Sequence, residues 1–103
     1  MNRDDHLVLL VIIAGRKQTD ALLAALPESG AHLINTTYAR GSVGVRPLPC
    51  SLGFVPEKDK AIITCVATNE KSDEILSLLT ERFHLGKPNT GISFTIPIEQ
   101  LKY

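Results

Sequence analysis

Two long apolar runs in the chain predict two buried strands. Leu7–Ile13 is rich in β-branched residues and has no polar position, so both of its faces are apolar. That pattern is typical of a central strand covered on both sides and less typical of a short helix. Lys60–Ala67 is also apolar on both faces, with Lys60 and Thr64 as its polar positions. We therefore expect these two segments to form the middle of a sheet.

Two further segments have strand composition and a weaker apolar signal. Ala31–Ala39 is less hydrophobic, which favours a strand nearer to the sheet edge. Ile92–Ile98 alternates apolar and polar side chains, and Pro97 marks its end. The sequence thus predicts four strands.

Between the strands lie two segments with helical periodicity. In Lys17–Leu26 the apolar residues recur at helical spacing, and Pro27 and Gly30 supply the stop. Asn69 can cap a second helix, which Gly86 closes. The apolar stripes are Ala21, Leu22, Ala25 and Leu26 in the first helix, and Ile75, Leu76, Leu79 and Phe83 in the second.

The order of these elements predicts one α+β domain. Gly41–Lys58 contains three glycines and three prolines without periodicity, so we expect a long loop between the second and third strands. Strand, helix, strand, loop, strand, helix, strand is the βαββαβ order of a ferredoxin-like sandwich, here a single domain over residues 1–103. Both helices would cover one face of the sheet. The other face, formed by Val8, Leu10, Ile63 or their neighbours, is too apolar for water, so another subunit should cover it.

Charge and hydropathy exclude several classes of function. Eleven basic residues balance eleven acidic ones, which gives no field to attract nucleic acid. The longest apolar run is too short to span a bilayer, and Asp4 and Asp5 before it do not suit a secretory signal. The cysteines, Cys50 and Cys65, form no disulfide framework. We expect a cytoplasmic protein that is not inserted in a membrane.

No catalytic or metal-binding constellation is evident in the sequence. His6, His32 and His84 have no cysteine or paired carboxylate at ligand spacing, which argues against a metal site. Cys50, in the long loop, has no neighbouring base that would make it a nucleophile, and no hydrolase or Walker motif occurs. The prediction is a protein that is not an enzyme and needs no cofactor.

Two glycine-containing loops could hold an anion. Gly41-Ser-Val-Gly44 is a weak signal by itself, because glycine pairs in loops usually only permit tight turns. Leu85–Gly91 adds Lys87 between two glycines, and free backbone amides with a lysine charge suit phosphate oxygens. A simple helix end and turn explains Leu85–Gly91 equally well.

These residues together resemble the PII nitrogen regulatory proteins. Gly86-Lys-Pro-Asn-Thr-Gly-Ile-Ser-Phe-Thr-Ile-Pro-Ile98 is similar to the B-loop and final strand of that family. Tyr38–Gly41 and Pro56–Lys58 resemble the two stems of its T-loop, in a short and divergent form. We use T-loop for residues 41–58 and B-loop for residues 85–91. The similarity covers nearly the whole chain, with the elements in the same order.

The resemblance implies a homotrimeric signal-transduction protein with an effector site in each cleft between subunits. The effector would be an adenine nucleotide (ATP, ADP or AMP) or another small anion. The T-loop would regulate a target protein, for which a membrane transporter is one candidate, through Arg46, Leu48 and Phe54. Gly86, Lys87 and Gly91 would hold phosphates, Arg40 and Gly41 would close the site from the base of the T-loop, and Ile34 and Asn35 would lie near the base or sugar.

A second interpretation remains open, in which the chain is a ligand-free trimeric interaction or assembly module. Ile92 stands where well-known family members carry a second lysine, and the sequence stops at Tyr103 without their C-terminal arginines. Each lost charged contact would remove roughly 1.5–3 kcal/mol of binding free energy. The T-loop also lacks a tyrosine, so covalent nucleotidylation is not expected.

Overall fold

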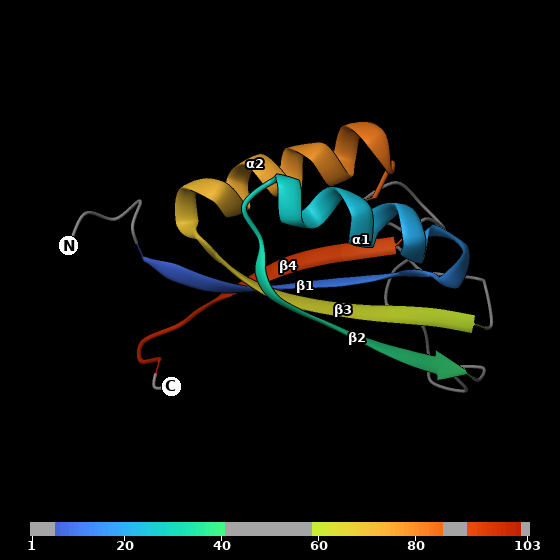
Figure 1. The fold of residues 1–103 in the computed structure, drawn as a ribbon, viewed down its shortest axis with the longest axis horizontal. Coiled ribbons are helices and arrows are strands. Elements are labelled where there is room, and N and C mark those ends of the chain that lie inside the picture. Colours follow the sequence, from blue (N-terminus) through green and yellow to red (C-terminus); the bar gives the residue numbers. More distant parts are fainter. Residues whose placement is uncertain (1–5, 41–58, 86–90, 102–103) are drawn as a thin grey trace.

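A computed structural model describes residues 6–40, 59–85 and 91–101 of the chain (Figure 1). The elements follow the predicted βαββαβ order, with one additional short 3-10 helix, η2, before the first α-helix. Their bounds are β1 Leu7–Gly15, η2 Arg16–Gln18, α1 Thr19–Glu28, β2 His32–Arg40, β3 Asp59–Thr68, α2 Asn69–Arg82 and β4 Gly91–Pro97.

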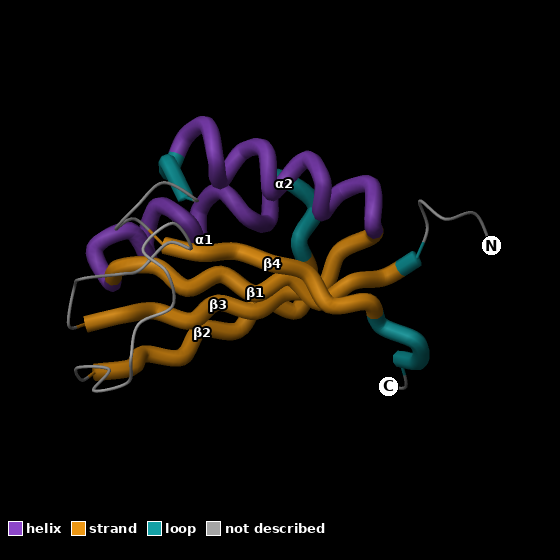
Figure 2. Tube along the Cα trace, turned by 180° about the vertical axis from the view of Figure 1, so that it is seen from behind, coloured by secondary structure: helices purple, strands orange, loops and turns teal. Residues whose placement is uncertain are grey.

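The four strands form one antiparallel sheet in the order β2-β3-β1-β4. Both helices pack on the same face of this sheet, so the domain has two layers (Figures 1 and 2). The expected ferredoxin-like architecture is therefore confirmed. As predicted, the two most apolar runs, in β1 and β3, are the central strands, and β2 lies at an edge.

The register divides each strand between a helix-covered face and an open face. In β1, Leu10, Ile12 and Ala14 belong to the core beneath the helices, and the alternate positions belong to the other face. The prediction that Val8, Leu10, Ile63 or their neighbours form the uncovered face is right only for the neighbours. Leu10 and Ile63 are fully buried in the core, and Val8 shares their face of the sheet.

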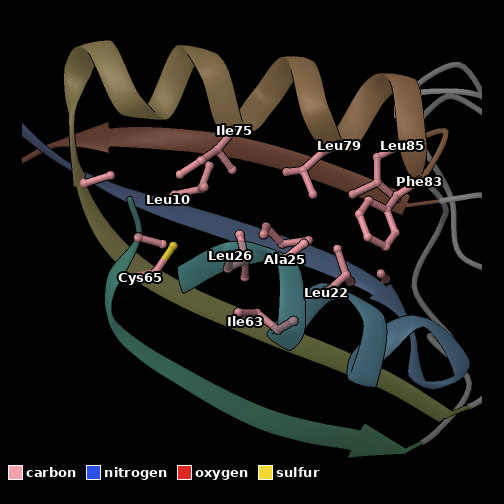
Figure 3. Close-up of a cluster of buried hydrophobic side chains, with 14 residues drawn as sticks. Leu10, Leu22, Ala25, Leu26, Ile63, Cys65, Ile75, Leu79, Phe83 and Leu85 are labelled. Carbon is pink, nitrogen blue, oxygen red and sulfur yellow. The ribbon is translucent and has the colours of Figure 1, made fainter. Parts of the chain in front are cut away.

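The core fills the space between the sheet and the two helices. Figure 3 shows leucines and isoleucines of β1, β3, α1 and α2 pointing toward one another across this layer. Cys65 lies among them and is a free thiol, in keeping with the expectation that it is a small core residue. The buried cluster comprises Leu10, Ile12, Ala14, Leu22, Ala25, Leu26, Ala31, Ile63, Cys65, Ala67, Ile75, Leu79, Phe83 and Leu85.

Both predicted ends of the second helix differ from the observed ones. The residue that caps α2 is Thr68, whose Oγ1 accepts a hydrogen bond from the Lys71 amide at 3.2 Å, so the prediction of Asn69 was wrong. The helix ends at Arg82, and His84 adopts a left-handed conformation with φ 58°, so the turn comes before the predicted Gly86. Gly86 itself lies outside the described residues.

The first helix, α1, ends in a turn that depends on Gly30. Pro27 lies inside the last turn of α1 and does not end it. Gly30 has a positive φ of 95°. In this conformation the Ala31 amide donates to the Leu26 carbonyl, and the Gly30 amide donates to the Pro27 carbonyl. This is the pattern of a Schellman motif, and it turns the chain into β2. In the part of the chain that the structure describes, no helix is long and apolar enough to cross a membrane.

Candidate functional site

Both loops that the sequence predicted to be functional start from the same end of the sheet. Arg40 is opposite Asp59 in the register, so residues 41–58 connect two strand ends that lie side by side. Gly91 pairs with Ala14 near the end of β1, and the next residue, Gly15, pairs with Lys60. The ends of all four strands therefore meet here, at the end of the molecule where β2 terminates (Figure 1).

Gly91 is required at this end by packing. Its φ is 151°, and a Cβ placed on it would lie 2.7 Å from the Ile13 carbonyl oxygen and 2.8 Å from Leu85 Cδ2. Neither distance is tolerated by a real side chain, because one neighbour is backbone and the other is a buried leucine. Leu85 and Gly91, which flank residues 86–90, therefore lie in contact.

The structure places Ile34 and Asn35 on opposite faces of β2. Ile34 is half-buried and packs against the core, whereas Asn35 is exposed and pairs with Thr64 on the open face. The register is irregular between His32 and Asn35, and Leu33 has a positive φ of 53°. Of these two residues, only Asn35 has a side chain that can contact a ligand on the open face.

Those predicted ligand-binding residues that the structure describes lie on two different strands. Ile34, Asn35 and Arg40 belong to β2, and Gly91 belongs to β4, and these two strands are the opposite edges of the sheet. With β3 and β1 between them, the two edges are about 14 Å apart at the usual spacing of strands. A site that uses both sets of residues has to span the width of the sheet or combine two copies of the chain.

Several predicted residues lie outside the described part of the chain. They are Gly41, Gly86 and Lys87 of the proposed effector site and Arg46, Leu48 and Phe54 of the proposed partner site. The predicted roles of these residues stay predictions. The backbone of Arg40 is described, at the end of β2.

The open face of the sheet is apolar in the middle and on one side, and polar along β2. Strands β1, β3 and β4 contribute mostly leucine, isoleucine, valine and phenylalanine to it, whereas β2 contributes His32, Asn35, Thr37 and Ala39. Phe94 is 41% exposed and Ile96 46% exposed on this face. The apolar positions are Leu7, Leu9, Val11, Ile13, Ile62, Val66, Ile92, Phe94 and Ile96.

One cation–aromatic contact lies at the end of the sheet from which both loops start, which we call the loop end. Sequence reasoning missed this contact. The guanidinium carbon of Arg16 lies 4.3 Å from the centroid of the Tyr38 ring. The two residues are far apart in sequence and share no motif, so only the tertiary fold brings them together. Two basic residues at the start of a helix were the one signal that could have drawn attention to Arg16.

The chemistry of the remaining candidate residues is limited. Burial raises the pKa of the Cys65 thiol from its ordinary 9.0 to about 11, so the thiolate is scarce at neutral pH. The described residues contain no group of three or more histidine, cysteine or acidic side chains placed to hold a metal ion. Cys50 lies outside the described residues.

Comparison with known proteins shows the fold. No protein family and no curated protein matches the sequence. Among solved structures, a protein described as a PII-like signalling protein from Thermus thermophilus matches with a TM-score of 0.65 and 22% identity, over 89% of this chain and 86% of that one. The B. subtilis GlnK–ATP complex matches with a TM-score of 0.64 and 15% identity, over 92% and 86% of the two chains.

A third similar structure shows that the fold also occurs inside larger proteins. A Bacillus cereus protein related to NIF3 matches with a TM-score of 0.64 and 11% identity, over 93% of this chain but only 26% of that one. At these identities the likeness concerns the backbone arrangement, which this chain shares with PII-like signalling proteins. Function has to be argued from the site.

Proposed function

We propose that this chain is a PII-like regulatory protein that is not an enzyme and acts as a homotrimer in the cytoplasm. Each cleft between subunits binds a small effector, and the T-loop regulates a target protein. The observation that carries the proposal is the division of the predicted site between β2 and β4, the two opposite edges of one sheet. Such a division is what a site shared between neighbouring subunits requires.

The open face supports self-association. A contiguous apolar surface of this kind on a small domain is usually covered by another protein surface. The polar strip along β2 and the exposed apolar side chains of β4 lie on opposite edges, so the face is not symmetric. A ring of three copies can place the β4 edge of one subunit against the β2 strip of the next, because such head-to-tail interfaces close into rings.

This arrangement would assemble the predicted effector site. Asn35, with Ile34 and Arg40, would come from the β2 edge of one subunit, and Gly91 from the β4 edge of its neighbour. Gly86 and Lys87 would supply the phosphate contacts beside Gly91, and Gly41 would join Arg40. The GlnK structure of the same fold was solved with ATP, which supports an adenine nucleotide as the effector class.

The proposed target is a protein that the T-loop reaches, with Arg46, Leu48 and Phe54 as its contacts. Arginine and aromatic side chains on a loop are typical anchors of protein interfaces. A membrane transporter, and with it a role in nitrogen regulation, is the candidate that the sequence resemblance supplies.

The alternative function is a trimeric assembly module that binds no nucleotide. Ile92 favours it, because this residue is paired with Ile13 on the open face and extends the apolar surface at the start of β4. A lysine at that position would have supplied a charge near the proposed phosphate site. The two functions share the trimer and differ only in the effector.

Calorimetric titration with ATP, ADP and AMP distinguishes these functions. We expect binding by the wild type, and an affinity at least about tenfold lower in Lys87→Ala, since a charged hydrogen bond contributes roughly 1.5–3 kcal/mol. Asn35→Ala should also weaken binding. Lys71→Ala, which removes a lysine from α2 on the helical face, is the matched control and should bind as the wild type does.

Three results would count against the effector site as proposed. Absence of binding to any nucleotide would favour the assembly module. Binding that Lys87→Ala leaves unchanged would place the nucleotide elsewhere. An equal loss in Lys71→Ala would indicate nonspecific attraction of the anion.

A further inference from the structure

The contact between Arg16 and Tyr38 forms an exposed cationic surface at the loop end of the domain. The Arg16 guanidinium lies 4.3 Å from the centre of the Tyr38 ring, which is within the range of a cation–π contact. Arg16 and Lys17 are exposed, and Tyr38 remains 50% exposed. Within the described residues, neither Arg16 nor Lys17 forms an ion pair. We call Arg16, Lys17 and Tyr38 the Arg–Tyr patch.

The fold builds this patch from small residues in the central strands. Ala14 of β1, Ala61 of β3 and Tyr38 of β2 lie in one row across the sheet, on the face that carries the helices. Both alanines are fully buried and short, which leaves room for the turn that begins at Arg16 to pack against the sheet. Tyr38, at the outer end of the row, stands beside this turn. The start of α1 and the end of β2 lie at the same end of the molecule in Figure 1.

The position of the two cations is unfavourable for the helix they begin. η2 runs directly into α1, and the partial positive charge of a helix lies at its first residues. Arg16 and Lys17 add two positive charges there, and among the described residues no side chain caps η2 or α1. Asp20 is the acidic residue in the first turn of α1, and within the described residues it forms no ion pair with them. Charges that oppose a local rule without internal compensation are a mark of sites kept for binding.

The stack prepares Arg16 for one kind of ligand group. The ring covers one face of the guanidinium, and the N–H groups of a guanidinium lie in its plane, at its edge. A planar guanidinium with free N–H groups matches a carboxylate with two parallel hydrogen bonds. Because the ring restricts the arginine side chain before binding, less conformational entropy is lost when the carboxylate arrives.

We propose that the Arg–Tyr patch docks an acidic segment of a partner protein, with a glutamate or aspartate of that segment on Arg16 and a second one near Lys17. Tyrosine and arginine are among the residues most enriched in the energetic centres of protein interfaces. The patch belongs to one chain and uses no residue of the proposed effector site. The proposal therefore requires neither a trimer nor a nucleotide.

A fluorescence anisotropy titration with a labelled hexaglutamate peptide tests this proposal, with labelled hexaserine as the peptide control. We expect the wild type to bind hexaglutamate only. Arg16→Gln should lower the affinity at least about tenfold, and Arg16→Lys about threefold or more, because lysine keeps the charge and loses the paired hydrogen bonds. Tyr38→Leu, which keeps every charge, should lower it by a similar factor.

Arg82→Gln is the matched control variant. Arg82 is also exposed and also lies near an aromatic ring, with its guanidinium carbon 5.7 Å from the Phe83 centroid, but it ends α2. Its loss removes the same charge and should change the affinity by less than about twofold, the extent expected of screened long-range attraction. Thermal unfolding of each variant verifies that it is folded, and Arg16→Lys provides a mild change if Tyr38→Leu is unstable.

Four outcomes would overturn the proposal. One is that no form of the protein binds hexaglutamate, and another is that Arg82→Gln weakens binding as much as Arg16→Gln does. Displacement of the peptide by inorganic phosphate at constant ionic strength would identify a small-anion site instead. Variants that lower only the unfolding temperature and leave peptide binding unchanged would mean that the stack only stabilises the packing of η2 against β2.

Discussion

At the scale of single residues, the two described glycines with positive φ differ in what surrounds them. A Cβ on Gly91 would meet the Ile13 carbonyl at 2.7 Å, whereas a Cβ on Gly30 would meet only the flexible Lys71 side chain, at 3.1 Å. We predict that Gly91→Ala lowers the free energy of unfolding by about 2–4 kcal/mol, from backbone strain plus overpacking. Gly30→Ala should cost about 1–2 kcal/mol, mainly from its left-handed backbone. Urea unfolding of both variants measures the difference, and equal costs would contradict the packing argument.

The buried thiol of Cys65 makes stability depend on alkaline pH. Its pKa is about 11 in the folded protein because of burial, against 9.0 for an exposed thiol. Between these values the unfolded chain loses the thiol proton and the folded chain keeps it, so ionisation favours unfolding as the pH rises. From this group alone we expect the free energy of unfolding to fall by about 1.4 kcal/mol between about pH 8 and about pH 10.

Cys65→Ala isolates this contribution. The variant loses packing at every pH, but over the same pH range its stability should decline less steeply than that of the wild type. Urea unfolding at the two pH values gives the difference between the slopes. Parallel slopes would mean that the thiol titrates normally in the folded protein.

At the scale of the elements, the cap of α2 offers a direct comparison of two neighbouring residues. Asn69 is the better cap by residue type, but Thr68 is the residue whose hydroxyl accepts from the Lys71 amide. We predict that Thr68→Ala lowers the free energy of unfolding by about 1 kcal/mol, the usual cost of removing a cap. Asn69→Ala should cost less, because its side chain accepts no hydrogen bond from the first turn among the described residues. Thermal and urea unfolding would show the order reversed if the threonine hydroxyl is not the cap.

The periodicity of the sequence predicts the helices and strands better than it predicts their ends. The apolar runs of β1 and β3 and the helical stripes of α1 and α2 were enough to predict these four elements, since burial imposes these patterns directly. The ends of the elements were predicted less well. Thr68 and Asn69 are both residue types that cap helices, and which of them caps α2 depends on where β3 ends. The Arg16–Tyr38 contact could not be predicted, since it depends on the row of Ala14, Ala61 and Tyr38 that the register creates.

At the scale of the whole molecule, strand order decides what the candidate site can be. The resemblance implied an effector site in the cleft between subunits. In the structure β2 and β4 are the two edges of the sheet, so Asn35 and Gly91 of one chain lie on opposite sides. Hydrophobicity along the chain predicted that β1 and β3 are central and that β2 lies near an edge, and the structure shows that β4 is the other edge. The open face has the same origin: Leu10 is covered and Leu9 is not, because neighbours in a strand point to opposite sides.

The open face leads to a prediction about assembly that one pair of adjacent residues can test. Phe94 is paired with Val11 on the open face, and Thr95 is exposed on the opposite side of the same strand. If three open faces pack together, Phe94→Asp would bury charges in an apolar interface without hydrogen-bond partners, which is strongly unfavourable. Thr95→Asp adds the same charge to the same strand, outside that interface.

Sedimentation equilibrium at micromolar concentration should therefore give three times the 11.2 kDa chain mass for the wild type and for Thr95→Asp, and the mass of one chain for Phe94→Asp. Circular dichroism should show that the separated chain keeps its sheet and helices, because Phe94 lies outside the core beneath the helices. A wild type that sediments as a monomer would remove the shared cleft and, with it, the effector site as proposed. Trimers in all three proteins would instead mean that the chain associates through another surface and leaves Phe94 in water.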